Sequence, residues 1–163
     1  MKKIVIIVLV VLMAAFSGWL YHYYSDSEVI KRQLHEASLA LSRNGAEAPV
    51  KTGLKMRIIK SMLAPECFTV IAEKSFKQAV ERDLIISYLL YYRNRYDPLS
   101  VTIENMTVEI AEDNRASVEA SVRVERKAAT TESGQIYMIT LELEKVEKKW
   151  LVNGAELPAG LVF

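Results

Sequence analysis

The distribution of apolar residues divides the chain into two parts. An uncharged apolar run extends from Ile4 to Leu20 and follows Lys2 and Lys3. At about 1.5 Å per residue, a helix over this run is roughly 25 Å long, slightly less than a hydrocarbon core of about 30 Å. It has no polar face, which argues against a helix of a soluble domain. The run predicts a transmembrane helix, so we divide the chain into a signal anchor (residues 1–24) and one following domain (residues 25–163).

Aromatic residues at the end of the apolar run and just after it extend the predicted membrane segment into the membrane interface. Rings with a polar tip favour this depth, and four of them lie there: Trp19, Tyr21, Tyr23 and Tyr24. Lys2 and Lys3 are expected to remain on the cytoplasmic side. The sequence thus predicts a single-pass protein of the cytoplasmic (inner) membrane, which contacts the bilayer through residues 4–20 and whose C-terminal domain lies outside the cytoplasm.

A cleaved signal peptide is the alternative interpretation of this segment. Ala15-Phe16-Ser17 could serve as a cleavage site, and the product would be a secreted or periplasmic domain. Cleavage there would leave a very apolar free terminus, so a retained anchor is favoured. A lipoprotein is excluded because the only cysteine of the chain is Cys67.

The pattern after residue 24 begins with helices. Ser25 and Glu28 fit a capping box, and apolar residues then recur every three or four positions up to Asn44-Gly45, at Ile30, Leu34, Ala37 and Leu41. A second helix is expected over about Thr52–Leu63, ended by Ala64-Pro65. Its apolar stripe is predicted to contain Leu54, Ile58 and Met62.

A short strand and a long helix are expected next. Cys67–Ile71 is apolar and β-branched, which is typical of a strand. The helix is predicted from about Ser75 to Tyr96, with one stripe formed by Phe76, Val80, Leu84, Tyr88 and either Tyr91 or Tyr92. Because it is apolar over much of its circumference, we expect other elements to wrap it. Tyr and Arg residues are mixed at the end of this helix, and the Tyr rings there are interpreted as capping a core.

The remainder of the chain predicts strands. Alternation runs through Val101–Glu104, changes phase at Asn105 and resumes in Met106–Ile110, which indicates a β-bulge or a bend. Further strands are expected over Ala116–Glu125, Tyr137–Glu144 and Trp150–Val152. Short turns make neighbours antiparallel, and one sheet face needs helices to cover it. The predicted fold class is therefore α+β, with a curved antiparallel sheet that wraps a long helix in a cone.

Charge and composition exclude several classes of function. The whole chain has a formal net charge of +1. Lys2 and Lys3 are two of its 21 basic residues, and all 20 acidic residues follow Tyr24, so residues 25–163 carry −1. This balance gives no electrostatic case for nucleic acid. One cysteine allows no internal disulfide framework. No phosphate-binding glycine loop or metalloprotease motif occurs, and we predict no cofactor and no metal site.

The element order resembles the nuclear-transport-factor-2-like superfamily, the cone shared with SnoaL-like, ketosteroid-isomerase-like and cystatin-like proteins. The resemblance covers about Ser25–Glu156 and rests on the order, on the passage from Ser75–Tyr96 into Val101–Ile103, and on the ending Leu141–Val152 with its charged turn and Trp150. Cystatin-like and pilus-assembly-type periplasmic domains have the same cone and remain alternatives. The resemblance implies a pocket at the wide end of the cone and frequent homodimers through the sheet.

Candidate pocket residues are few, and no catalytic residue can be assigned. Five side chains are predicted to border a pocket: His35, Asp83, Tyr88, Tyr91 and Trp150. Asp83 with Tyr88 is the sharpest acid–base hypothesis. The alternative for Asp83 is a solvated carboxylate paired with Arg82 or a lysine.

Two hypotheses for the function follow. The first is a membrane-tethered extracytoplasmic binding or scaffold module, which binds a protein partner or a small ligand. The second is an extracytoplasmic isomerase or dehydratase-like enzyme that acts on a small apolar substrate in the cone pocket. The contents of the cone discriminate between them.

Overall fold

The computed structural model describes residues 11–13, 25–71, 76–128 and 131–158. Three helices and six strands follow Ser25. The helices are α2 (Asp26–Leu41), α3 (Pro49–Met62) and α4 (Arg82–Arg95). The strands are β1 (Leu63–Ile71), β2 (Phe76–Glu81), β3 (Leu99–Ile110), β4 (Arg115–Ala128), β5 (Thr131–Val146) and β6 (Lys149–Leu157). The α+β class is confirmed.

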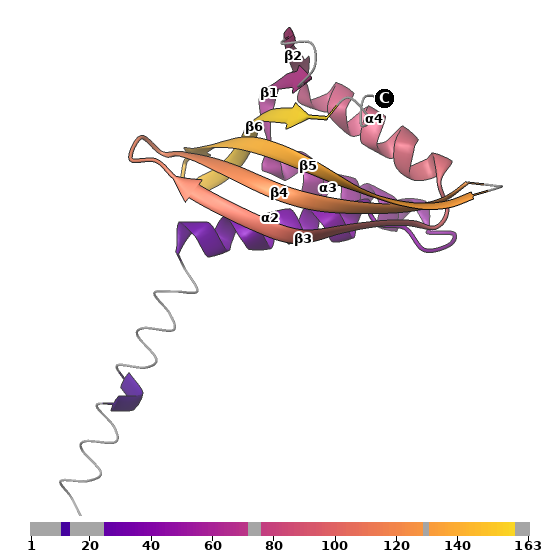
Figure 1. Cartoon of the computed structure of the whole chain (residues 1–163), viewed down its shortest axis with the longest axis horizontal. Coiled ribbons are helices and arrows are strands. Elements are labelled where there is room, and N and C mark those ends of the chain that lie inside the picture. The colour runs from indigo at the N-terminus through magenta and orange to yellow at the C-terminus, as the bar shows by residue number, and fades with distance from the viewer. Residues whose placement is uncertain (1–10, 14–24, 72–75, 129–130, 159–163) are drawn as a thin grey trace, which may run out of the picture.

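The six strands form one curved sheet in the order β2-β1-β6-β5-β4-β3 (Figure 1). The prediction of a wholly antiparallel sheet is wrong for one pair, because β1 runs parallel to β6. A parallel pair needs a long crossover, and here α4 and β3–β5 lie between the two strands in the chain. The predicted bulge is confirmed, since the β3–β4 register shifts between Ile103 and Asn105.

The main core lies between α2 and the sheet. In β4 every second residue is buried, as the alternation predicts: Ala116, Val118, Ala120, Val122 and Val124. Ile30 and Leu34 of α2 pack against this face together with Trp150 of β6. In Figure 1, α2 runs along the edge of the sheet formed by β3. Burying such large apolar side chains stabilises the fold by roughly 1.5–3 kcal/mol each.

The predicted helix Ser75–Tyr96 is wrong in its first third. Phe76–Glu81 forms β2, which pairs with β1 through contacts such as Cys67 opposite Val80, and α4 begins only at Arg82. The spacing of Phe76 and Val80 explains the error. Residues four apart share a face of a helix, but four is also an even number, so they share a face of a strand.

The buried face of the sheet packs mainly against α2 rather than α4. Arg93 is the one residue of α4 that is fully buried, although Tyr92 and, just beyond the helix, Tyr96 pack against the main core. Tyr88 and Tyr91 are 51% and 64% exposed. The two Tyr rings at the core confirm the interpretation of the helix end. The expectation that other elements surround this helix is wrong. Ile86, Leu89 and Leu90 pack beside the buried residues of α3, whereas the side with Tyr88 and Tyr91 faces solvent.

The second predicted helix has a different face and different ends. It begins at Pro49, a residue suited to the first helical position, and β1 follows it directly at Leu63. Met56, Ile59 and Met62 are buried, whereas Leu54 and Ile58 are 53% and 40% exposed. The predicted stripe is therefore correct only at Met62.

The start of α2 is fixed to the sheet by polar contacts. Ser25 caps the helix, and its hydroxyl accepts a hydrogen bond from the Glu28 amide at 3.4 Å, as the capping box predicts. Asp26 accepts hydrogen bonds from Lys145 Nζ at 2.7 Å and from Trp150 Nε1 at 3.0 Å. The hydrogen bond from Lys145 is the main reason that the pKa of Asp26 lies below its usual value.

The predicted anchor lies almost entirely outside the described residues. Val11–Met13 are helical, and Trp19, Tyr21, Tyr23 and Tyr24 are not described. Within the described residues, no helix has the length and apolar character to cross a membrane.

Candidate ligand-binding site

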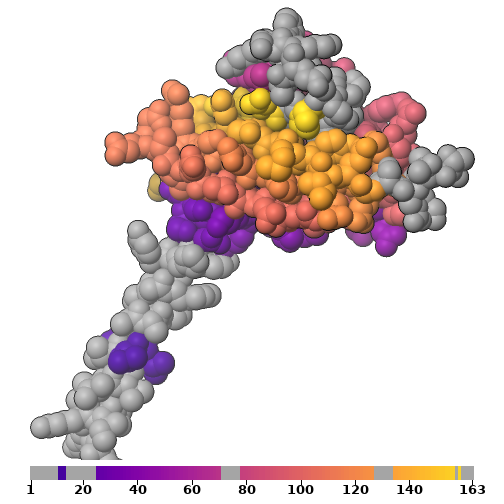
Figure 2. Space-filling model, viewed as in Figure 1, coloured from indigo at the N-terminus to yellow at the C-terminus, as the bar shows by residue number. Residues whose placement is uncertain are grey.

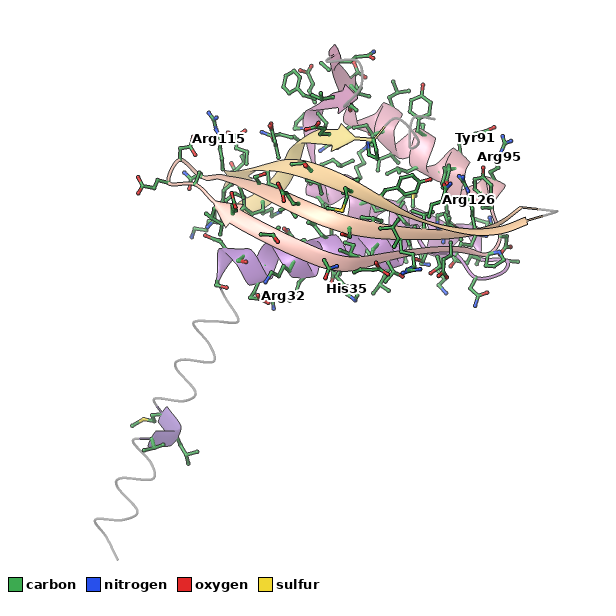
Figure 3. The ribbon with its side chains drawn as sticks, viewed as in Figure 1. Arg32, His35, Tyr91, Arg95, Arg115 and Arg126 are labelled. Atoms are coloured by element: carbon green, nitrogen blue, oxygen red, sulfur yellow. The ribbon has the colours of Figure 1, made fainter. Side chains whose placement is uncertain are left out.

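The five predicted pocket residues lie on three elements: His35 on α2, Trp150 on β6, and Asp83, Tyr88 and Tyr91 on α4. His35 is exposed on α2, and Figure 3 shows it far from Tyr91 on α4. Trp150 is 2% exposed in the main core and donates to Asp26. Asp83 and Tyr88 are both exposed on α4. The described structure therefore does not bring these side chains together in one pocket.

Asp83 pairs with a lysine, as its alternative interpretation expects. Its carboxylate contacts Lys60 Nζ, and 72% of its side chain is exposed. The Lys60 hydrogen bond lowers the pKa of Asp83. Tyr91 accepts a hydrogen bond from Arg95 Nη1 at 3.0 Å. Both contacts lie on the surface. An exposed ion pair such as Lys60–Asp83 contributes little to stability.

A cavity of about 890 Å³ lies elsewhere, where the end of α2, the start of α3 and the ends of three strands meet. Leu39, Pro98 and Leu99 supply apolar wall. The charged residues of the lining are Arg43, Glu47, Lys51, Lys55, Glu125 and Arg126. The backbone of Arg43 holds this region together, because it exchanges two hydrogen bonds with Leu99, of 2.7 and 2.9 Å.

Glu47 stands at the centre of an ion-pair network on one side of the cavity. It accepts hydrogen bonds from Lys55 Nζ at 2.8 Å and from Arg93 Nη2. Both donors also reach the Ser42 carbonyl. The side chains of Glu47 and Arg93 are only 9% and 1% exposed. Hydrogen bonds from Lys55 and then Arg93 lower the pKa of Glu47 to about 2. Glu47 is therefore an anion with two committed partners at neutral pH.

Arg126 forms the centre of a second cluster, whose other members are aromatic or neutral. Its Nη1 donates to the Tyr92 hydroxyl at 2.8 Å, and its guanidinium lies 5.4 Å from the centre of the Tyr96 ring. Gln135 accepts from Arg126 at 3.4 Å and from the Tyr137 hydroxyl. Burial is the main cause of a raised pKa at Tyr92. The Tyr92 hydroxyl therefore remains neutral at physiological pH.

Cys67 lies in the core of the β1–β6 contact and has no reactive environment. It is 4% exposed, and its thiol donates to the Val152 carbonyl at 3.2 Å. Burial raises the pKa of the Cys67 thiol. A nucleophilic cysteine needs the opposite shift. Among the residues described, no three His, Cys, Asp or Glu side chains lie close enough together to hold a metal ion.

Neither charged cluster could be predicted from a local sequence pattern. Glu47 lies in a loop 46 residues before Arg93, and Arg126 lies 34 residues after Tyr92. Neither separation belongs to a local repeat. The one feature of the sequence that drew attention to this region is the mixture of Tyr and Arg at the end of α4. That mixture does not predict which residues these side chains contact.

The fold, with three helices against one curved sheet and a cavity at one end, defines an α+β cone domain. More specifically, the chain is similar in fold to solved structures, among them proteins named as nuclear-transport-factor-2-like. The Kfla4162 protein of Kribbella flavida matches with a TM-score of 0.66 and 12% identity, over 82% of this chain and 90% of that one.

Two further solved structures have the same fold. A protein named as a dehydratase of this family, from Streptomyces avermitilis, matches with a TM-score of 0.61 and 11% identity, over 82% and 95% of the two chains. A protein named as a calcium/calmodulin-dependent protein kinase II association domain, from Xanthomonas campestris, gives 0.60 and 17%, over 83% and 88%. No family model and no curated protein sequence matches the chain. At these identities the likeness establishes the fold alone.

Proposed function

We propose that the chain is a membrane-tethered extracytoplasmic binding or scaffold module, whose cone domain takes up a small ligand or a protein partner. The uncharged run Ile4–Leu20 behind Lys2 and Lys3 supports the tether and its orientation. The proposed location is the cytoplasmic (inner) membrane, with the domain on the far side. Signal cleavage would instead release the same domain into the periplasm.

The state of the acidic residues is the observation that carries a binding role. Glu47, the buried carboxylate of the cavity, is committed to Lys55 and Arg93 with a pKa of about 2. Asp83 is exposed and paired with Lys60, and His35 is exposed on α2. A general base needs a pKa near the working pH and a position within reach of a substrate. These contacts therefore favour recognition of a ligand over proton transfer.

Two experiments test this proposal. A reporter enzyme fused after Phe163 is expected to be active outside the cytoplasm, and activity inside would contradict the tether. A photo-crosslinking amino acid at Leu39, which is 57% exposed in the cavity lining, is expected to capture a ligand or partner in intact cells. The same amino acid at Met138, on the open face of β5, is the matched position for a partner on the sheet.

A homodimer through the sheet is the form of protein partnership that Met138 would detect. Figure 2 shows the face of β4 and β5 that α2 leaves uncovered. Ile136 and Met138 lie on it and are 54% and 63% exposed. A crosslink between two copies at Met138 would support the dimer. No adduct at Leu39 and none at Met138 would argue against the binding role.

The second candidate is an extracytoplasmic isomerase or dehydratase-like enzyme that acts on a small apolar substrate. The favouring observation is the Tyr92 hydroxyl, which is partly buried beside Arg126 and could stabilise a developing oxyanion. Turnover of small cyclic ketones or hydroxy compounds by the purified protein, and its loss in Tyr92→Phe, would support this candidate. Equal turnover in Tyr92→Phe would exclude a role for this hydroxyl.

A further inference from the structure

The charged lining of the cavity is more basic than the domain that contains it. Its four basic residues are Arg43, Lys51, Lys55 and Arg126, and its two acidic residues are Glu47 and Glu125. Residues 25–163 as a whole carry a formal net charge of −1. The lining of the cavity therefore carries a net positive charge, although the domain as a whole is slightly acidic.

Internal pairing leaves part of this positive charge uncompensated. Glu47 compensates Lys55 together with the buried Arg93, and Arg43 lies 3.6 Å from the carboxylate of Asp97. Arg126 has no such partner in the described part of the chain. The groups that it contacts are the Tyr92 hydroxyl, the Gln135 side-chain carbonyl and the Tyr96 ring, all of them neutral. These contacts orient the guanidinium without neutralising it.

Lys51 is the second uncompensated cation. It is exposed, lines the cavity and makes no ion pair within the residues that are described. It also lies in the first turn of α3, which contains no acidic residue and whose N-cap, Ala48, offers no side-chain hydrogen bond. The unpaired amide groups of a helix start carry a partial positive charge, which adds to that of Lys51.

The acidic residue Glu125 does not cancel this arrangement. It precedes Arg126 in β4, so its side chain projects from the opposite face of the strand, and it is exposed to solvent. Arg126 is partly buried against Tyr92 and Tyr96. Water screens a charge on Glu125 more strongly than a charge held against these rings.

The rest of the lining limits the kind of anion. The volume of about 890 Å³ lies within the roughly 300–1,000 Å³ of small-molecule sites and far exceeds one phosphate ion. Leu39, Pro98 and Leu99 give the cavity an apolar side. A ligand that fits both features has one anionic group and an apolar body.

We propose that this cavity binds an amphiphilic anion, a phosphate or carboxylate joined to an apolar body, with Arg126 and Lys51 as the residues that contact the anionic group. This inference rests on the proposed binding role and names the class of ligand. A soluble metabolite and the headgroup of an anionic lipid share this chemistry, and both can reach a domain beside a membrane.

Calorimetric titration of the full chain in a neutral detergent tests the soluble form of the ligand. Phenyl phosphate and benzoate are expected to bind, and phenol, which lacks the anionic group, is expected to bind at least ten-fold more weakly. Loss of one charge-assisted hydrogen bond should weaken binding by about ten-fold in Arg126→Gln and by a smaller factor in Lys51→Gln. Raising the salt concentration should weaken the wild-type affinity.

Matched variants separate the site from a general charge effect. Arg123→Gln changes the same strand on its other face, where Arg123 pairs with Glu104, and Arg57→Gln changes an exposed residue of α3 outside the cavity. Both should retain wild-type affinity. If Arg126→Gln does not fold, Lys51→Gln decides, because Lys51 is exposed and has no structural partner in the described chain. Equal affinity in Lys51→Gln and Arg57→Gln, or no anion binding, would overturn the proposal.

Co-sedimentation with vesicles distinguishes the two sources. Residues 25–163 would be released from the full chain by a protease site introduced before Ser25, and then mixed with phosphatidylglycerol or phosphatidylcholine vesicles. Retention on phosphatidylglycerol alone, lost in Lys51→Gln but kept in Arg57→Gln, supports a lipid headgroup. Binding of phenyl phosphate without vesicle retention supports a soluble ligand. If neither occurs while Leu39 or Met138 still captures a partner in cells, the anion site is wrong and the binding role stands.

Discussion

The body of α2 and the loop that follows it are fixed to the rest of the molecule by different physical means. Along its length, Ile30 and Leu34 pack on the apolar face of the sheet, with Val118 fully buried beneath them. Beyond its C-terminal end, Glu47, Lys55 and Arg93 join the loop after α2 to α3 and α4 by charge and hydrogen bonds. The first contact is continuous and non-directional, whereas the second depends on a few atoms.

This difference shows that two kinds of stabilising contact are separated within one small domain. Apolar burial supplies most of the free energy of folding and tolerates small changes in position. A buried ion pair repays only part of the cost of removing its charges from water, but it fixes geometry when all its partners are present. In this chain the cavity described above lies at the charged end, beside Glu47 and Lys55. Three substitutions and one pH dependence test this contrast between apolar and charged contacts, in order of expected effect.

Trp150→Ala should have the largest effect on stability. The side chain is 2% exposed, and its removal leaves a cavity in the core and takes away one of the two donors of Asp26, so that only Lys145 remains. We expect a loss of about 3–5 kcal/mol in the free energy of unfolding, measured with denaturant. Tyr91→Ala, at a ring that is 64% exposed, is the control and should change the value by about 0.5 kcal/mol or less.

Glu47→Gln should be the next most damaging change, because Arg93 would remain buried without a counter-charge. Removal of one partner of a buried pair costs about 3 kcal/mol or more. Arg93 already has its Nε atom buried without a hydrogen-bond partner among the described residues. The double change Glu47→Leu with Arg93→Met should therefore recover at least half of the loss. A double variant as unstable as the sum of the two single changes would contradict this account.

The pH dependence of stability should separate the charged end from the apolar end. The pKa of Glu47 is lowered to about 2 in the folded protein from 4.5, so its contribution is complete above about pH 5 and decreases as the pH falls toward 2. The difference in stability between wild type and Glu47→Gln should shrink over this range. The difference between wild type and Tyr91→Ala should stay constant. A wild-type advantage over Glu47→Gln that persists at pH 2 would contradict the assignment.

Asp83→Asn should have the smallest effect, although it removes an ion pair just as Glu47→Gln does. The contact with Lys60 is exposed, and surface pairs of this kind are screened by water and salt. The midpoint of denaturant unfolding should equal that of the wild type within error. A clear shift would mean that exposure does not decide the value of an ion pair in this protein.

Most of the apolar end was predictable from sequence, because its signal is local. The alternation of Ala116–Glu125 and the bulge at Asn105 follow from side chains that point to opposite faces of a strand. The prediction for Phe76–Glu81 was wrong because a spacing of four residues fits both a helix and a strand. Pairing with β1 decides that this segment is a strand. Local pattern is thus sufficient where only one period fits.

The charged end was not predictable, because its contacts join residues that no periodicity relates. Glu47, Arg93 and Arg126 lie in a loop, a helix and a strand. Their meeting depends on how α3 and α4 cross the end of the sheet. His35 and Asp83 had suitable chemistry, but the fold leaves both in solvent.

Asp26 also sets how a mechanical pull on the N-terminus would enter the domain. Without its contacts, tension applied before Ser25 would peel the first turn of α2 away from the sheet. Because Asp26 is bound to Lys145 of β5 and Trp150 of β6, a force applied at the N-terminus would act directly on two neighbouring strands. These strands pair by backbone hydrogen bonds across the middle of the sheet, so the load is spread over many bonds. A domain pulled by its N-terminus would therefore gain mechanical resistance from this one carboxylate.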